Sequence, residues 1–135
     1  MSGGGSTDYV AGYRYLFGIH MGVCRGPIDE LVEIRVGDRT AWVIDEIGKE
    51  RPITIGVVVA DGRIESVDVL AFRESRGGEV RYPFFTKQYK NLGLKDGDRL
   101  DGHVDGITGA TLSVWAVTKV SRLALVLHSE VIRND

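Results

Sequence analysis

The chain has 135 residues, of which 43% are apolar and 27% are charged, and its net charge is -2. These values are typical of one soluble globular domain and give no support for nucleic-acid binding. The single cysteine, Cys24, excludes an internal disulfide and a cysteine-based zinc site, and we expect it to be a buried thiol. No segment approaches the roughly 18 consecutive apolar residues of a membrane span. Residues 1–7 are rich in Gly and Ser, so we expect a flexible tail without the pattern of an export signal.

Two pairs of segments in the first half predict β-hairpins. Residues 31–36 alternate apolar and charged side chains, Gly37-Asp38 follows as a turn, and residues 40–44 are again mostly apolar. Residues 53–60 and 63–72 are rich in β-branched side chains and flank Asp61-Gly62, a dipeptide favoured in type I′ turns. We expect this second hairpin to form the centre of the sheet.

The second half predicts two helices. Pro83 is suited to a first helical turn, and apolar spacing over residues 84–92 predicts a short amphipathic helix that ends at Gly93. A longer apolar stripe predicts a helix from about Ala110 to Ser129, with Thr108 as its N-cap. The expected fold class is α+β, with a mainly antiparallel sheet packed by the short helix and the long C-terminal helix.

Residues 105–111 read DGITGAT and come directly before the long helix. On this register Thr111 lies in the first turn, beside N–H groups that lack intrahelical partners and at the positive end of the helix dipole. A phosphate group is favoured in such a place, and Gly109 and Ala110 leave room around the hydroxyl. Asp-Gly and Thr-Gly are also common in turns and helix starts, so a purely structural role is the alternative.

The heptapeptide resembles the attachment motif of the covalent FMN-binding domains found in sodium-pumping quinone reductase and Rnf-type complexes. Residues 47–53, 57–64 and 72–80 resemble other stretches of that family in the same order, so the resemblance covers about residues 43–132. Ser113 matches the hydroxyl residue usual after the motif, whereas Val114 replaces a serine often found there.

The resemblance implies an electron carrier, rather than a stand-alone enzyme, with FMN esterified to Thr111. It also implies a flavin transferase and a membrane or periplasmic redox partner, and hence an extracytoplasmic or membrane-associated location. Asp105 could cap the turn or help to position the metal-bound FAD donor of the transferase. The predicted cofactor-binding residues are Thr111, Ala110, Gly109, Thr108, Asp105, Gly106 and Glu74.

Other candidate groups have two interpretations each. The loop at residues 74–79 either faces the flavin or is a polar loop whose two glycines need unusual backbone angles. Four aromatic residues either flank the isoalloxazine ring or belong to the core, namely Tyr82, Phe84, Phe85 and Trp115. The three histidines have no metal-like spacing and complete no Ser/His/Asp set, so we expect no catalytic residue and no metal site.

Residues 12–42 are different, because they resemble the start of tailed-phage tail-tip proteins. This resemblance ends where the FMN-binding resemblance begins, which gives the chain a chimeric appearance. The expected division is a tail at 1–7, an N-terminal segment at 8–42 and an FMN-binding domain at 43–135. The alternative function is a non-catalytic structural or assembly module of phage-tail type with no flavin.

Overall fold

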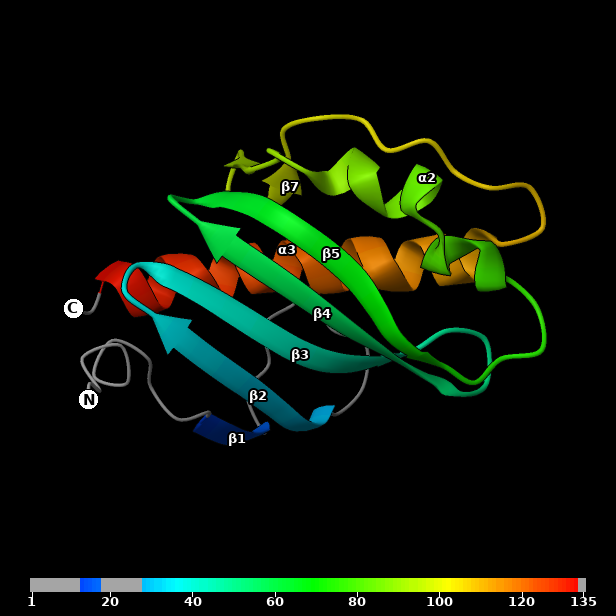
Figure 1. The fold of residues 1–135 in the computed structure, drawn as a ribbon, viewed down its shortest axis with the longest axis horizontal. Coiled ribbons are helices and arrows are strands. Elements are labelled where there is room, and N and C mark those ends of the chain that lie inside the picture. The colour runs from blue at the N-terminus through cyan, green and yellow to red at the C-terminus, as the bar shows by residue number, and fades with distance from the viewer. Residues whose placement is uncertain (1–12, 18–27, 134–135) are drawn as a thin grey trace, which may run out of the picture.

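The computed structural model describes residues 13–17 and 28–133. Five strands form one antiparallel sheet in the order β1-β2-β3-β4-β5, and the long helix α3 covers one of its faces (Figure 1). The strands are β1 (Tyr13–Phe17), β2 (Ile28–Val36), β3 (Arg39–Ile47), β4 (Pro52–Ala60) and β5 (Arg63–Phe72). They are followed by η1 (Gly78–Arg81), α2 (Pro83–Thr86) and η2 (Lys87–Tyr89). The strands β6 (Leu94–Lys95) and β7 (Arg99–Leu100) then form a separate two-stranded sheet, and α3 (Thr111–Arg133) ends the described chain. The α+β class is confirmed.

Both predicted hairpins are present. Asp61 and Gly62 have φ angles of 55° and 76°, and two successive positive φ values are what a type I′ turn requires. The expected position of the second hairpin is wrong for one of its arms, because β4 lies inside the sheet and β5 is its edge strand.

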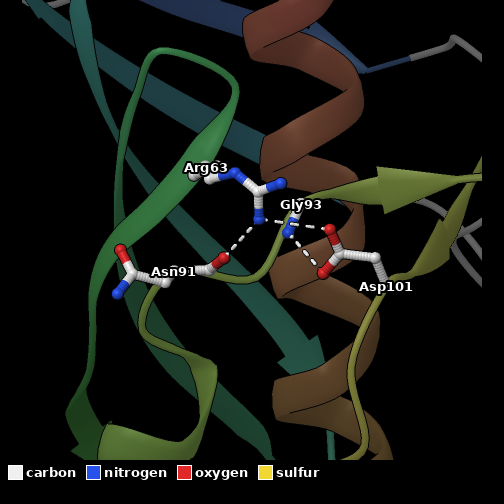
Figure 2. Close-up of polar contacts among 4 residues, drawn as sticks. All are labelled: Arg63, Asn91, Gly93 and Asp101. Carbon is white, nitrogen blue, oxygen red and sulfur yellow. Dashed lines mark hydrogen bonds and ion pairs between the residues drawn. The ribbon is translucent and has the colours of Figure 1, made fainter.

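The outer edge of β5 is covered by the segment that follows η2. Ile64 donates its N–H to Leu92 O and accepts from Asn91 N–H, both at 2.8 Å. Figure 2 shows the adjoining contacts: the Arg63 guanidinium bonds to Asn91 O at 2.6 Å and pairs with Asp101 at 3.2 Å. The other carboxylate oxygen of Asp101 accepts from Gly93 N–H at 3.0 Å. These contacts cover the edge of β5 at its first residues, where an unpaired strand would otherwise be open to pairing.

The core lies between the sheet and α3. Alternate side chains of β3 and β4 point toward the helix, and Trp42, Ile44, Ile55 and Val57 are no more than 1% exposed. Leu123 of α3 is fully buried against them. Burial of each such side chain contributes about 1.5–3 kcal/mol. This packing fixes α3 along the sheet (Figure 1), and Thr111 is the first residue of the helix while His128 lies in its last two turns.

The two helices differ from their predicted bounds. The segment expected to be helical at 84–92 forms only α2 and η2, because the backbone becomes extended at Lys90, with a ψ of 133°. Asn91, with a φ of 71°, then turns the chain toward the edge of β5. The long helix runs to Arg133, beyond the predicted end.

The predicted N-cap is also wrong. The helix α3 begins at Thr111, so Thr108 lies three residues before its first helical residue. Ala110 N–H bonds to Ile107 O at 3.0 Å, and Gly109 has a φ of 83°, so a tight turn precedes the helix. A backbone turn thus stands where a capping side chain was expected.

The expected seam between residues 42 and 43 falls inside β3, which pairs with β4 along its whole length. The flexible tail predicted at 1–7 and the thiol of Cys24 lie outside the described residues. Within the part of the chain that the structure describes, no helix has the length and apolar character needed to cross a membrane.

Candidate cofactor site at the start of α3

Thr111 is the first residue of α3, and its side chain is exposed. The first bond of the helix runs from Val114 N–H to Ala110 O at 2.9 Å. The N–H groups of residues 111–113 therefore have no acceptor within the helix. An exposed hydroxyl lies beside free donors and the positive end of a helix of 23 residues.

Glu74 connects the end of β5 to the loop between β3 and β4. Its Oε2 accepts from the backbone N–H groups of Glu50 at 2.6 Å and Arg51 at 3.0 Å, and also from that of Lys49. The hydrogen bonds from Arg51 and Glu50 hold the pKa of the Glu74 carboxyl below its ordinary value. This oxygen therefore fixes the loop at residues 48–51. Glu74, which was predicted to bind the cofactor, thus positions the loop that borders the cofactor site.

Gly77 holds the loop after β5 against the first turn of α3. Its φ is 87°, and a Cβ at this position would come within 2.3 Å of Ser113 Oγ. A side chain here would therefore be strained by the backbone angle and would force Ser113 to shift. Of the two glycines expected to need unusual angles, Gly77 does, whereas Gly78 opens η1 without a positive φ.

Two adjoining hollows open around this contact. A hollow of about 360 Å³ contains Thr111 and is lined by Lys49, Glu74, Arg76, Gly77, Gly109, Ala110, Thr111, Leu112 and Ser113. A second hollow, of about 680 Å³, is lined by Phe72, Glu74, Ser75, Arg76, Gly77, Gly78, Glu79, Arg81, Tyr82, Thr108 and Gly109. Because four lining residues are shared, the hollows form one site of the size that small ligands and cofactors occupy. We call it the double hollow.

The double hollow brings together five of the seven predicted cofactor residues, Thr108, Gly109, Ala110, Thr111 and Glu74. The other two lie apart from it. Asp105 donates its N–H to Gln88 Oε1 at 2.8 Å, and its exposed carboxylate lies 2.9 Å from His103 Nε2. Gly106 lines a different hollow, of about 530 Å³, beside Trp115 and Arg122.

The four candidate aromatic residues are also separated. Phe85 is fully buried and belongs to the core, and Phe84 lines neither part of the double hollow. Trp115 is 60% exposed and lines neither part of the double hollow, although it lies one helical turn after Thr111. Tyr82 lines the larger hollow, where the Arg81 guanidinium lies 5.9 Å from its ring centroid. Tyr82 is thus the one of the four that borders the double hollow.

The smaller hollow also contains two cations that were not predicted as cofactor-binding residues: Lys49, and Arg76 of the candidate loop at residues 74–79. Both belong to stretches that carry the family resemblance, but nothing local indicates that they face Thr111. Among the residues at 13–17 and 28–133, no group of three His, Cys, Asp or Glu side chains could hold a metal ion.

Comparison with known proteins agrees with this geometry. The family model described as an FMN-binding domain matches residues 48–126, which is more than half of the chain. The matched span contains the loop fixed by Glu74, the Gly77 contact and Thr111. A search of curated proteins found no match. The chain belongs to the FMN-binding domain family, as a flavin-binding electron-transfer module.

Proposed function

We propose that this module carries its FMN covalently, as a phosphoester on Thr111. The observation that carries the proposal is the position of Thr111. Its hydroxyl is exposed at the first residue of α3 and opens into the double hollow. A transferase can reach a hydroxyl in this position, and the attached flavin has a preformed hollow beside it.

The surroundings of Thr111 fit a phosphodiester. Such a group keeps one negative charge, which the free N–H groups of the first helical turn and the helix dipole stabilise. Gly109 and Ala110 present almost no side chain, so the ribityl chain can leave the helix start without obstruction. The bound flavin supplies one-electron and two-electron redox chemistry, and the protein supplies attachment, orientation and electrostatics.

The same proposal includes two partners. A flavin transferase would load the FMN, and a membrane or periplasmic redox partner would exchange electrons with it. Both belong outside the cytoplasm or at a membrane.

The test is retention of flavin after denaturation. The protein is exported through an added signal peptide, co-expressed with a flavin transferase, and examined for flavin fluorescence on a denaturing gel. We expect a fluorescent band for the wild type, none for Thr111→Ala, and a retained band for Thr108→Ala, because only Thr111 carries the link. Thr108 is the matched control because its side chain also borders the double hollow but lies outside the helix.

Two results would refute the covalent assignment. Flavin that co-purifies with the native protein but is released on denaturation would mean noncovalent FMN. A folded protein that never carries flavin, and is indifferent to Thr111→Ala, would favour the structural or assembly module of phage-tail type.

A further inference from the structure

We propose that Lys49 and Arg76 form a cation pair that holds the phosphate of FMN at the start of α3. This inference rests on the proposed function, because it concerns the same site. It assigns a positioning role to two residues that come from separate loops and meet in the hollow that contains Thr111.

Both cations are available for a ligand. Within residues 13–17 and 28–133, neither the Lys49 ammonium nor the Arg76 guanidinium makes a hydrogen bond or an ion pair, and both side chains are exposed. The neighbouring cations are engaged: Arg73 bonds to Pro52 O at 2.9 Å, Arg81 to Gly78 O at 3.1 Å, and Lys119 pairs with Glu46 at 3.0 Å.

The backbone that carries each cation is fixed. Lys49 belongs to the loop whose N–H groups bond to Glu74 Oε2, and Arg76 precedes Gly77, which contacts Ser113 at the helix. The two long side chains thus start from anchored backbone and line the same hollow as Thr111. A site built in this way loses less conformational entropy on binding than one built on mobile loops.

The charge balance of the hollow favours an anion. Its charged lining residues are Lys49, Arg76 and the carboxylate Glu74, so cations exceed carboxylates by one. One oxygen of Glu74 is already surrounded by three backbone N–H groups, which offset part of its negative charge. Lysine offers a point charge and arginine a planar fork of donors, and together they suit the non-bridging oxygens of a phosphate.

The inference predicts a preference for FMN over riboflavin, which differ only by the phosphate. Unflavinylated protein, purified without the transferase, is titrated with each compound and binding is followed by flavin fluorescence anisotropy. We expect FMN to bind at least about 10-fold more tightly than riboflavin, since charge-assisted hydrogen bonds to phosphate exceed neutral ones in strength. The preference should fall as salt is raised, because the cations are exposed.

Substitution of the cations tests the assignment. Lys49→Gln and Arg76→Gln should each weaken FMN binding by about 5-fold and leave riboflavin binding unchanged. Lys95→Gln is the matched control, because Lys95 is exposed on β6 and lines no part of the double hollow. Equal affinity for the two flavins, no binding of either, or an equal loss in Lys95→Gln would overturn the inference.

The outcome is separable from that of the proposed function. If the transferase attaches FMN to Thr111 but the Gln variants keep the full FMN preference, the cation pair is wrong and the covalent assignment stands. If no flavin is attached but the preference depends on Lys49 and Arg76, the cation pair stands and the covalent assignment is wrong.

Discussion

The two ends of α3 use their polar groups in opposite ways. At the His128 end, buried polar side chains bond to one another and to backbone, and the neighbouring β4–β5 turn is fastened by the Arg63 contacts of Figure 2. At the Thr111 end, the double hollow is surrounded by the exposed residue Thr111, by N–H groups without intrahelical acceptors, and by two cations with no side-chain partner among the residues that the structure describes. The first arrangement stabilises the fold, and the second leaves donors for a ligand. We call the His128 end of α3 the closed end and the Thr111 end the open end.

The closed end is a short chain of hydrogen bonds. Trp42 Nε1 donates to Thr40 Oγ1 at 2.8 Å, and Thr40 Oγ1 lies 2.8 Å from His128 Nδ1. Gly62 N–H points to His128 Nε2 at 3.4 Å. Both ring nitrogens of His128 therefore face a polar partner inside the protein. Burial is the main cause that lowers the pKa of His128 below its ordinary value.

The largest loss of stability is expected at Gly77, where the loop after β5 contacts the open end of α3. Gly77→Ala should destabilise the protein by about 2–4 kcal/mol, because it adds a clash with Ser113 to backbone strain at positive φ. Urea unfolding measures this loss. Gly62→Ala is the control, because Gly62 has a similar φ of 76° and nothing within 4 Å of the added Cβ, so strain alone should cost about 1–2 kcal/mol. Equal losses would show that contact with the helix is unimportant.

The next effect tests whether the closed end depends on its hydrogen bonds. Thr40→Val keeps the shape but removes the oxygen shared by Trp42 and His128, and should cost about 2 kcal/mol through unsatisfied buried groups. Thr40→Ser keeps the hydroxyl and should retain most of the stability in urea unfolding. Flavin attachment should be unchanged in both variants. A valine variant as stable as the wild type would remove the basis of the comparison.

The closed end should also make stability dependent on pH. The pKa of His128 is lower in the folded protein than its ordinary 6.5, so the unfolded chain binds the proton more tightly. The contribution of His128 to the free energy of unfolding is therefore fully present above pH 6.5, and it is lost as the pH falls through the lower pKa of the folded state. Urea midpoints between pH 8 and 5 measure this. The dependence should diminish in His128→Gln and persist in His103→Gln, since His103 is exposed; an identical dependence in both variants contradicts the account.

The smallest global effect is expected for Glu74→Gln. The neutral amide accepts hydrogen bonds less strongly than a carboxylate, so the loop at residues 48–51 should loosen while the core stays intact. Amide hydrogen exchange at Glu50 and Arg51 should accelerate several-fold, with little change in the urea midpoint. Glu79→Gln is the control, because this exposed carboxylate also lines the larger hollow. Equal protection in the Glu74 variant would show that Glu74 does not fix the loop.

The sequence predicted those features that depend on local pattern. Three such features each lie within one segment: the β-branched pattern of residues 53–72, the Asp61-Gly62 turn and the apolar stripe of α3. The structure confirms all three. The motif at 105–111 was placed correctly before the helix, because its glycines and hydroxyl residues are themselves the signal.

Features that depend on distant contacts were missed. Glu74 bonds to backbone about 24 residues away, so its type and neighbours do not reveal which way it points. Asp105 is turned from the double hollow by Gln88, 17 residues earlier. The edge position of β5 depends on pairing with Leu92, and the approach of Lys49 to Thr111 depends on the whole sheet. Tertiary contacts of this kind produce no repeating pattern of residue types along the sequence.

The most direct test of the central claim is the intact mass of the exported protein after co-expression with a flavin transferase. The account predicts an increase equal to FMN less one water for the wild type and for Thr108→Ala, and none for Thr111→Ala. An unchanged wild-type mass in a folded, exported sample, or an increase that persists in Thr111→Ala, would contradict it.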